Sequence, residues 1–213
     1  MDSKYLSGVD FVNMEPQKRA AFMNSLTGFK SASLIGTIDK SNNINLSIFS
    51  SVTHLGSNPA LIGFISRPNT TERHTLENIF QTKLYTINHI NKHIYKQAHQ
   101  TSARYPKNIS EFDATGLTPE FIAGMTAPYV KESHIKYGLE FVEQHELKVN
   151  NTILVIGKVT DVILPENCLL NDGSIDIEEA ETITISGLDS YHTTKRLARL
   201  TYAKTDKMTV ELI

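Results

Sequence analysis

The chain has 213 residues, of which 40% are hydrophobic and 21% are charged, so it can bury a substantial core and is most simply one domain. Its formal net charge is −2, with acidic and basic residues interspersed, and we therefore do not expect nucleic acid as a partner. The first residues lack the apolar core of a signal peptide, and no apolar run approaches the roughly 18 residues that cross a bilayer. We expect a cytoplasmic protein without a membrane partner.

The N-terminal third predicts one helix and a hairpin. Proline at position 16 suits the first turn of a helix, and an apolar stripe runs from there to residue 26, which predicts a short helix that caps the domain. Residues 33–38 and 44–52 are strand-like runs joined by D-K-S-N-N, whose residues tolerate turn geometry. Together they predict a hairpin.

Two further strands flank a short helix. Residues 60–66 form a nearly continuous apolar run, and residues 83–90 alternate as a half-buried strand does. Between them, residues 75–82 fit a helix of about two turns, with Thr75 as its N-cap and Asn78 as its third residue. The start of this helix would direct backbone N–H groups toward any ligand beside it.

The second half of the chain predicts a long hairpin. A helical pattern at residues 91–102 is followed by a segment punctuated by proline and glycine, which we expect to pass over the sheet as a loop. Residues 137–149 and 152–164 then predict two long strands that turn at Asn150 and Asn151. Six to eight strands without β-α-β alternation predict a mainly β fold, a closed antiparallel barrel with a few short helices.

Several enzyme motifs are missing from the sequence. There is no G-x-G pair, no G-x-S-x-G elbow and no C-x-x-C, and the pair His145-Glu146 lacks the second histidine of H-E-x-x-H. The neighbours of Cys168 carry no cation that would lower a thiol pKa, so we expect a buried or half-buried thiol without a catalytic role. These absences weigh against hydrolase and zinc-protease functions.

The histidines and the acidic residues predict neither a metal site nor a catalytic acid/base pair. His89, His93 and His99 would form a metal-binding face only if one helix carried them, and His89 falls at the end of a predicted strand. We therefore expect surface or interface histidines and no bound metal. The acidic run at residues 178–181 predicts a solvated face rather than an acid/base pair.

A polar loop between the third strand and the helix indicates an anionic ligand. Arg67 and Arg73 flank S-R-P-N-T-T-E-R, which can fold back so that both guanidinium groups converge on one dianion. Ser66, Thr75 and the N–H groups at the helix start would be further donors. Two surface arginines that pair with nearby glutamates would show the same pattern.

One strand face is also unusually polar. Period-two geometry places Asn45, Ser47, Phe49 and Ser51 on the same face of their strand. This face suits a polyol chain beside an aromatic ring, although a solvent-facing strand would alternate in the same way.

The order of these pieces resembles the flavin reductase-like family of FMN-binding split-barrel proteins, which includes the flavoredoxins. Further matches are E-F-D-A-T-G-L-T-P at residues 111–119, A-P-Y-V-K-E-S at 127–133, and V-I-G-K-V followed by N-D-G-S-I-D within 155–176. The family often continues r-l-G-G-x-x-Y, where this chain has I-S-G-L-D-S-Y at residues 185–191. The resemblance therefore leaves the nicotinamide side of the site open.

The resemblance implies a Greek-key split β-barrel over residues 1–213, present as a homodimer with FMN near the subunit interface. It implies hydride transfer from NADH or NADPH to flavin, for which the protein supplies binding and geometry rather than a catalytic nucleophile or base. The residues that would hold FMN, carried over position by position, are Asn45, Ser47, Phe49, Ser50, Ser51, Ser66, Arg67, Arg73, Thr75, Asn78 and Asn88.

Two other functions stay open at this point. The chain could carry electrons or sense redox state through FMN without nicotinamide turnover, or the same barrel could bind another ligand such as haem. The homodimer has modest independent support, because residues 152–164 are apolar on both faces, more than one barrel wall readily covers.

Overall fold

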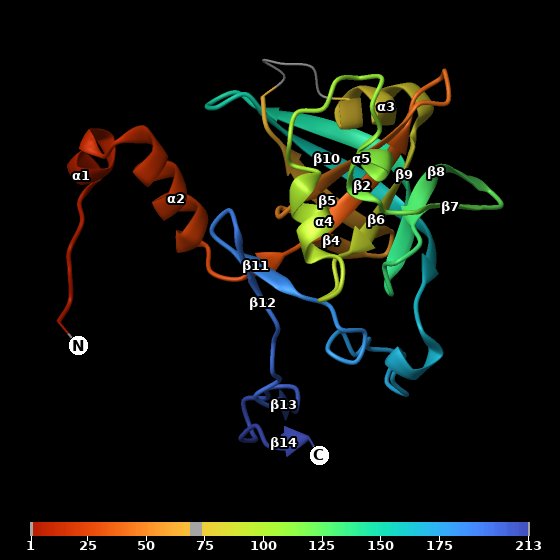
Figure 1. The fold of residues 1–213 in the computed structure, drawn as a ribbon. Helices are drawn as coiled ribbons and strands as arrows, with labels where there is room; N and C mark the ends of the chain where they lie inside the picture. Colours follow the sequence, from red (N-terminus) through yellow and green to blue (C-terminus); the bar gives the residue numbers. More distant parts are fainter. Residues whose placement is uncertain (1, 69–73, 213) are drawn as a thin grey trace.

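The computed structural model describes residues 2–68 and 74–212, and its main body is a curled antiparallel sheet (Figure 1). The sheet has seven strands in the order β3-β2-β6-β9-β10-β5-β4. Their bounds are Ile44–Phe49 (β3), Ser33–Ile38 (β2), Leu84–His89 (β6), Lys136–Leu147 (β9), Thr152–Ile163 (β10), Ala60–Ser66 (β5) and Thr53–Ser57 (β4). This arrangement confirms the predicted mainly β fold.

The barrel is split where the two edge strands meet. Strands β3 and β4 follow each other in the chain, and residues 50–52 carry the backbone from one edge to the other. A side chain replaces the backbone ladder here: the Ser51 hydroxyl donates to the Ile65 carbonyl (3.0 Å) and accepts from the Ile65 N–H (3.1 Å). In the part of the chain that the structure describes, β3 pairs with β2 along one edge, and its other edge, the far edge, has no strand partner.

Strand β2 is buried on both faces, and each face contributes to its own apolar cluster. Leu34 packs outward against helices α4 (Tyr95–Gln100) and α5 (Glu111–Thr115), together with β11 (Thr184–Ser186). Ile35 packs inward with helix α3 (His74–Thr82) and the barrel strands. Because a strand places successive side chains on opposite faces, this continuous apolar run stabilises both layers at once.

Smaller elements surround the barrel. The hairpin β7 (Pro119–Ile122) and β8 (Met125–Val130) packs across β2 and β6, and β1 (Lys30–Ser31), β11 and β12 (Ser190–His192) form a second small sheet. A short 3-10 helix, η1 (Glu166–Cys168), and the C-terminal pair β13 (Arg199–Leu200) and β14 (Glu211–Leu212) complete the chain. No helix among the described residues is both long and apolar enough to span a membrane.

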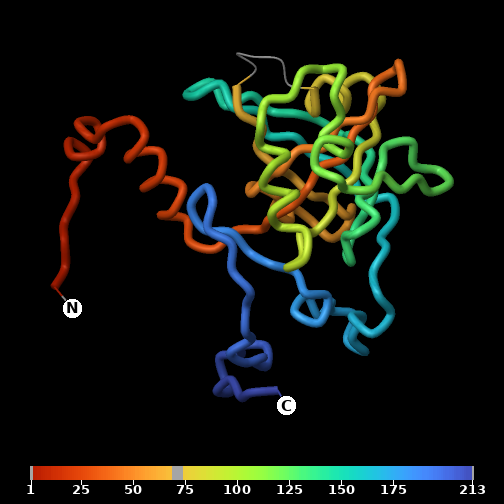
Figure 2. The backbone as a smooth tube through the Cα atoms, viewed as in Figure 1, coloured from red at the N-terminus to blue at the C-terminus, as the bar shows by residue number. Residues whose placement is uncertain are grey.

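The N-terminal helices lie outside the barrel rather than on it. Helix α1 (Gly8–Asn13) and helix α2 (Pro16–Leu26) project away from the main body, as Figures 1 and 2 show, and neither contains a buried residue. The predicted helix is present, but its role as a cap was wrong. Within this N-terminal arm, the Phe11 and Phe22 rings pack against each other with centroids 5.7 Å apart.

Most predicted strands are confirmed at their expected positions, including the hairpin that turns at Asn150 and Asn151. The predicted helix at residues 91–102 is shorter, because the Asn91 amide holds the preceding turn by donating to the Glu132 carbonyl (2.8 Å). The segment expected as a loop contains β7, β8 and the short helix α5. Cys168 is buried, as predicted, and burial raises the pKa of its thiol.

We expect Gly36→Ala to lower the free energy of unfolding by about 1–3 kcal/mol, as overpacking of a tight core does. A Cβ at this position would overlap the carbonyl oxygen of Pro128 and lie 2.6 Å from Thr86 Oγ1. Gly8→Ala is the control, because its Cβ would meet nothing within 4 Å. Chemical denaturation measures both, and equal midpoints for the two variants would contradict the tight packing of β8 on β2.

Candidate functional site

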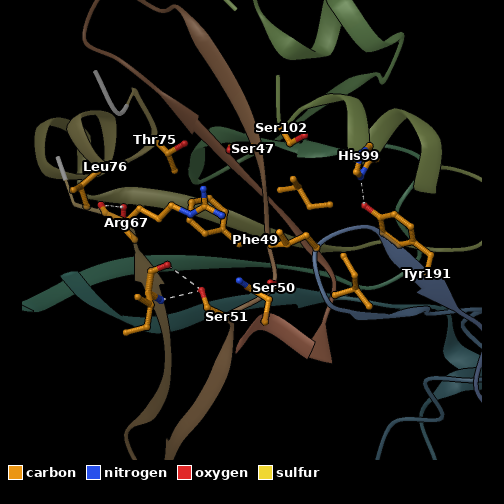
Figure 3. A pocket seen from close by; sticks show the side chains of 16 residues that line it. Ser47, Phe49, Ser50, Ser51, Arg67, Thr75, Leu76, His99, Ser102 and Tyr191 are labelled. Atoms are coloured by element: carbon orange, nitrogen blue, oxygen red, sulfur yellow. Dashed lines mark hydrogen bonds between the residues drawn. The ribbon is translucent and has the colours of Figure 1, made fainter. Parts of the chain in front are cut away.

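A cavity of about 410 Å³ lies beside the free edge of β3 (Figure 3). Its volume falls within the range of about 300–1,000 Å³ that is usual for small-molecule and cofactor sites. The lining residues are Asn24, Ser47, Ile48, Phe49, Ser50, Ser51, Ile65, Ser66, Arg67, Thr75, Leu76, His99, Ser102, Ile185, Leu188 and Tyr191. We call it the main cavity.

One end of the main cavity is positively charged. Arg67, at the end of β5, is exposed and lies beside the first turn of α3, where Thr75 is buried. Arg67 is the one arginine or lysine among the described lining residues, and no carboxylate accompanies it there. Because helix N-termini and guanidinium groups both favour anions, this end suits a phosphate.

Thr75 is held from across the site. Its Oγ1 accepts a hydrogen bond from Asn45 Nδ2 at 3.0 Å, and this bond joins α3 to β3. Helix α3 begins at His74, one residue earlier than predicted. Thr75 therefore lies inside the first turn and is not the N-cap, which corrects the expectation from sequence.

The middle of the main cavity is polar along β3 with one aromatic ring. Ser47 and Phe49 are half-buried, and the Phe49 ring packs edge-on against Phe64, with centroids 5.0 Å apart at 70°. Ser50 and Ser51 follow where the chain turns toward β4. The sequence predicted this combination of hydroxyl groups and a fixed aromatic ring.

We call the opposite end the uncharged end, because its described lining residues include no lysine, arginine or carboxylate. It comes from distant parts of the chain. His99 of α4 and Tyr191 of β12 lie at the far side of Figure 3 from Arg67, and His99 Nδ1 lies 3.0 Å from the Tyr191 hydroxyl. Burial raises the pKa of Tyr191 to about 12, so the hydroxyl keeps its proton at neutral pH. Leu188 and Ile185 add an apolar wall.

A half-buried lysine, Lys30, fixes this wall. Lys30 Nζ donates to the carbonyl oxygens of Asn24 (3.0 Å) and Gly187 (2.9 Å), so it ties the end of α2 to the turn between β11 and β12. Burial lowers the pKa of Lys30. Asn24, and Leu188 next to Gly187, both line the main cavity.

A second cavity of about 340 Å³ adjoins the main one and shares Ser47, Thr75 and Ser102 with it. Its other lining residues are Asn45, His74, Thr101, Ala103, Arg104, Tyr105 and Glu111. Glu111 is 7% exposed and accepts a hydrogen bond from the Leu46 N–H at 3.0 Å. Burial raises the pKa of Glu111, which the Leu46 N–H opposes. We call this space the side cavity.

The structure brings most of the predicted site residues together. Seven of them line the main cavity: Ser47, Phe49, Ser50, Ser51, Ser66, Arg67 and Thr75. Asn45 lines the side cavity. Arg73 falls outside the described residues, so its predicted role stays a prediction.

Asn78 and Asn88 lie elsewhere. Asn78 is buried and donates to Thr37 Oγ1 at 3.1 Å, beneath the site. Asn88 is fully buried: its amide donates to the Leu34 carbonyl (3.2 Å) and accepts from the Val130 N–H (2.9 Å). Both amides join core elements to one another and do not line the main cavity.

Sequence reasoning missed the uncharged end. His93 and His99 are exposed, as the expectation of surface or interface histidines required, but the contact between His99 and Tyr191 was not predicted; His93 Nε2 lies 2.9 Å from Glu181. The one available signal was Tyr191 itself, the tyrosine kept in I-S-G-L-D-S-Y. Nothing in the sequence placed Asn24 or Ser102 beside β3.

Comparisons with known proteins identify the family. The chain belongs to the flavin reductase-like family, because the model of the flavin reductase like domain matches residues 29–175. An inferred flavin reductase with a split barrel domain from Shewanella frigidimarina is 55% identical, with a TM-score of 0.91 over 94% of this chain and 100% of that chain. The split-barrel fold predicted from the resemblance is thus confirmed.

More distant structures share the fold. Flavoredoxin of Desulfovibrio vulgaris is 24% identical, with a TM-score of 0.69 over 84% of this chain and 91% of that chain. An FMN-binding protein from Thermus thermophilus, solved with bound 1-cyclohex-2-enone, is 16% identical, with a TM-score of 0.67 over 90% of this chain and 95% of that chain.

We expect Asn88→Leu to reduce stability by about 1–3 kcal/mol, because the buried Val130 N–H loses its acceptor. The flavin affinity of the protein that remains folded should stay unchanged, since Asn88 lies outside the main cavity. Thermal unfolding and flavin titration at low temperature measure the two effects separately. A variant of normal stability that binds flavin weakly would instead place Asn88 at the ring.

Proposed function

We propose that this protein is an NAD(P)H-dependent flavin reductase that binds FMN in the main cavity, with NADH or NADPH as reductant. The observation that carries the proposal is the polarity of the cavity: Arg67 and the start of α3 at one end, an uncharged wall at the other. A ligand with one dianionic end and one planar apolar end matches this gradient.

Each part of FMN would meet a suited group. The phosphate would lie at Arg67 and Thr75, with Ser66 as a further donor, and the ribityl hydroxyls would lie beside Ser47. The ring would pack near Phe49, where Ser50 and Ser51 offer hydroxyl and backbone groups to its polar edge. Membership in the flavin reductase-like family and the FMN-binding neighbour of the same fold support this assignment.

The protein's own residues bind and orient rather than react. When bound, FMN supplies the ring that takes up a hydride from reduced nicotinamide. Phe49 is held by Phe64, and Tyr191 is held by His99, so both rings are positioned before a ligand enters. The protonated Tyr191 hydroxyl provides a hydrogen-bond group at the uncharged end without adding charge. Positioning of this kind is the protein's contribution to hydride transfer.

The first experiment is a visible spectrum of the purified protein followed by an assay of NADH and NADPH oxidation. Flavin bands with nicotinamide oxidation support the reductase. Flavin bands without oxidation favour an electron carrier or sensor, and a Soret band would replace flavin with haem.

We expect Arg67→Ala to weaken FMN by about 10–100-fold, because a charge-assisted hydrogen bond contributes about 1.5–3 kcal/mol. Riboflavin, which lacks the phosphate, should bind both proteins alike. Arg196→Ala is the matched control, since Arg196 pairs with Asp176 (2.9 Å) and does not line the main cavity. Fluorescence titration measures all three proteins, and equal losses for the two flavins would place the phosphate elsewhere.

We also propose that the whole chain acts as one domain and as a homodimer. Large apolar side chains are exposed on both terminal arms: Val9, Val12, Met23, Leu26, Phe29, Leu197, Leu200, Tyr202, Met208, Val210 and Leu212. On β10, the strand expected to face a partner, Val162 is 49% exposed. An exposed apolar area of this extent is typical of a surface that another chain covers. A twofold partner would cover the same arms on both copies.

Leu26→Asp and Val162→Asp test the two surfaces separately. Each should shift the protein to monomers if its surface lies in the dimer, because an obligate interface buries more than about 2,000 Å² and excludes unpaired charges. Lys40→Asp, in the exposed turn after β2, is the control. Sedimentation at micromolar concentration gives the mass, and a wild-type monomer with a full complement of FMN would contradict the proposal.

A further inference from the structure

The wall at the uncharged end of the main cavity includes two segments that lie outside the residues matching the family model, which covers residues 29–175. Asn24 belongs to the last turn of α2, before this range, and Leu188 belongs to the turn between β11 and β12, after it. Both residues line the main cavity. This part of the wall is therefore an addition to the common domain.

Lys30 joins the two segments from inside the common domain. Its Nζ donates to the Asn24 carbonyl (3.0 Å) and to the Gly187 carbonyl (2.9 Å). Its backbone lies in β1, opposite Ile185 of β11, and its carbonyl accepts from Thr184 Oγ1 (2.6 Å). One residue thus contacts both segments, and we call these contacts the Lys30 junction.

Helix α2 depends on this junction more than a buried helix would. It has 11 residues, none of which is buried, and an isolated helix shorter than about 12–15 residues is only marginally stable. Its last turn contains no basic residue, although the last carbonyls of a helix lack partners within it and favour a nearby cation. Lys30 supplies that cation at Asn24. Without it, the end of α2 would fray and Asn24 would leave the cavity wall.

The turn between β11 and β12 packs directly against the end of α2. Gly187 has a φ of 62°, in the left-handed region that favours glycine, and a Cβ there would lie 3.1 Å from Ser25 Oγ. Because the turn approaches the helix this closely, the bond from Lys30 to the Gly187 carbonyl also fixes Leu188, the next residue.

We propose that Lys30 is a positioning residue of the flavin site, which holds the end of α2 and the β11–β12 turn together as one wall and so places Asn24 and Leu188 against the ligand. This inference rests on the proposed binding of FMN in the main cavity. In that binding mode the wall meets the end of the flavin that is remote from the phosphate, and FMN and riboflavin share that end. Loss of the Lys30 junction should therefore weaken both flavins alike, whereas loss of Arg67 should weaken FMN alone.

The test compares FMN and riboflavin affinities, by fluorescence titration, in the full-length wild type, Lys30→Met and Lys30→Arg. Lys30→Met keeps the apolar stem without its donors and should weaken both flavins by about tenfold, as loss of one hydrogen bond does. Lys30→Arg keeps a cation with several donors and should restore most of the affinity. Lys18→Met is the matched control, because Lys18 is exposed on the same helix and does not line the main cavity.

Two further measurements separate positioning from general stability. Without any flavin, Lys30→Met should speed hydrogen exchange in α2 and in the β11–β12 turn, while β2 and β6 stay protected. In a background that carries Asn24→Ala and Leu188→Ala, Lys30→Met should change flavin affinity by less than about twofold, because the groups that it positions are already gone.

The outcomes separate this inference from the proposed function. A wild type that binds neither flavin contradicts the proposed function, while hydrogen exchange without flavin still tests the Lys30 junction. Flavin affinities or α2 exchange rates that Lys30→Met leaves unchanged overturn the inference alone, and so does a tenfold loss that persists in the Asn24→Ala, Leu188→Ala background. A loss for FMN only would assign Lys30 to the phosphate. Faster exchange throughout the barrel, or failure of Lys30→Met to fold, would make Lys30 a general stabilising residue and likewise overturn the inference.

Discussion

The far edge of β3 is the constraint on which the site depends. An edge strand presents backbone N–H and C=O groups that must find partners when they are buried. Here the Leu46 N–H is satisfied by the Glu111 carboxylate rather than by another strand, and the same edge continues to Ile48 in the wall of the main cavity. Helix α5 therefore closes one part of the edge while leaving the next part open. A full ladder on β3 would have closed the barrel and removed the site.

The strand beneath this edge makes it rigid. β2 is buried on both faces between two apolar clusters, and close contact with β8 leaves no room for a side chain at Gly36. The buried bond between Asn45 and Thr75 then ties β3 to the start of α3. As a result, the start of α3 and the polar strand of the main cavity are fixed relative to each other before a ligand binds. Fixing binding groups in advance lowers the entropic cost of association.

The sequence predicted features that depend on neighbouring residues better than features that depend on contacts between residues far apart in the chain. The hairpin predicted at residues 33–38 and 44–52 follows from local periodicity and turn residues, and it is present with its second strand ending at Phe49. The strand predicted at residues 60–66 is confirmed as Ala60–Ser66. The polar face of β3 and Arg67 lie within one stretch of chain, so they could be grouped from sequence. The sequence could not show that Asn88 lies outside the site. The alternation of polar and apolar residues along its strand does not reveal that its amide group hydrogen-bonds to the backbone of Leu34 and Val130. The stripe on α2 predicted a helix that caps the domain, whereas the helix projects away from the barrel and has no buried residue. The contact between His99 and Tyr191 joins residues far apart in the chain, and no local pattern encodes it.

The two ends of the main cavity differ in charge, and this difference would set the direction in which the proposed ligand binds. Arg67 lies inside residues 29–175, which match the family model, whereas Leu188 and Tyr191 lie beyond them. An anionic ligand that entered in the reverse sense would place its phosphate against Leu188 and the uncharged Tyr191. A desolvated charge without a partner costs several kcal/mol, far more than the hydrogen bonds at that end could return. In the proposed binding mode the Arg67 guanidinium would therefore orient the ligand, and Leu188 and Tyr191, from the segment after residue 175, would contact its other end.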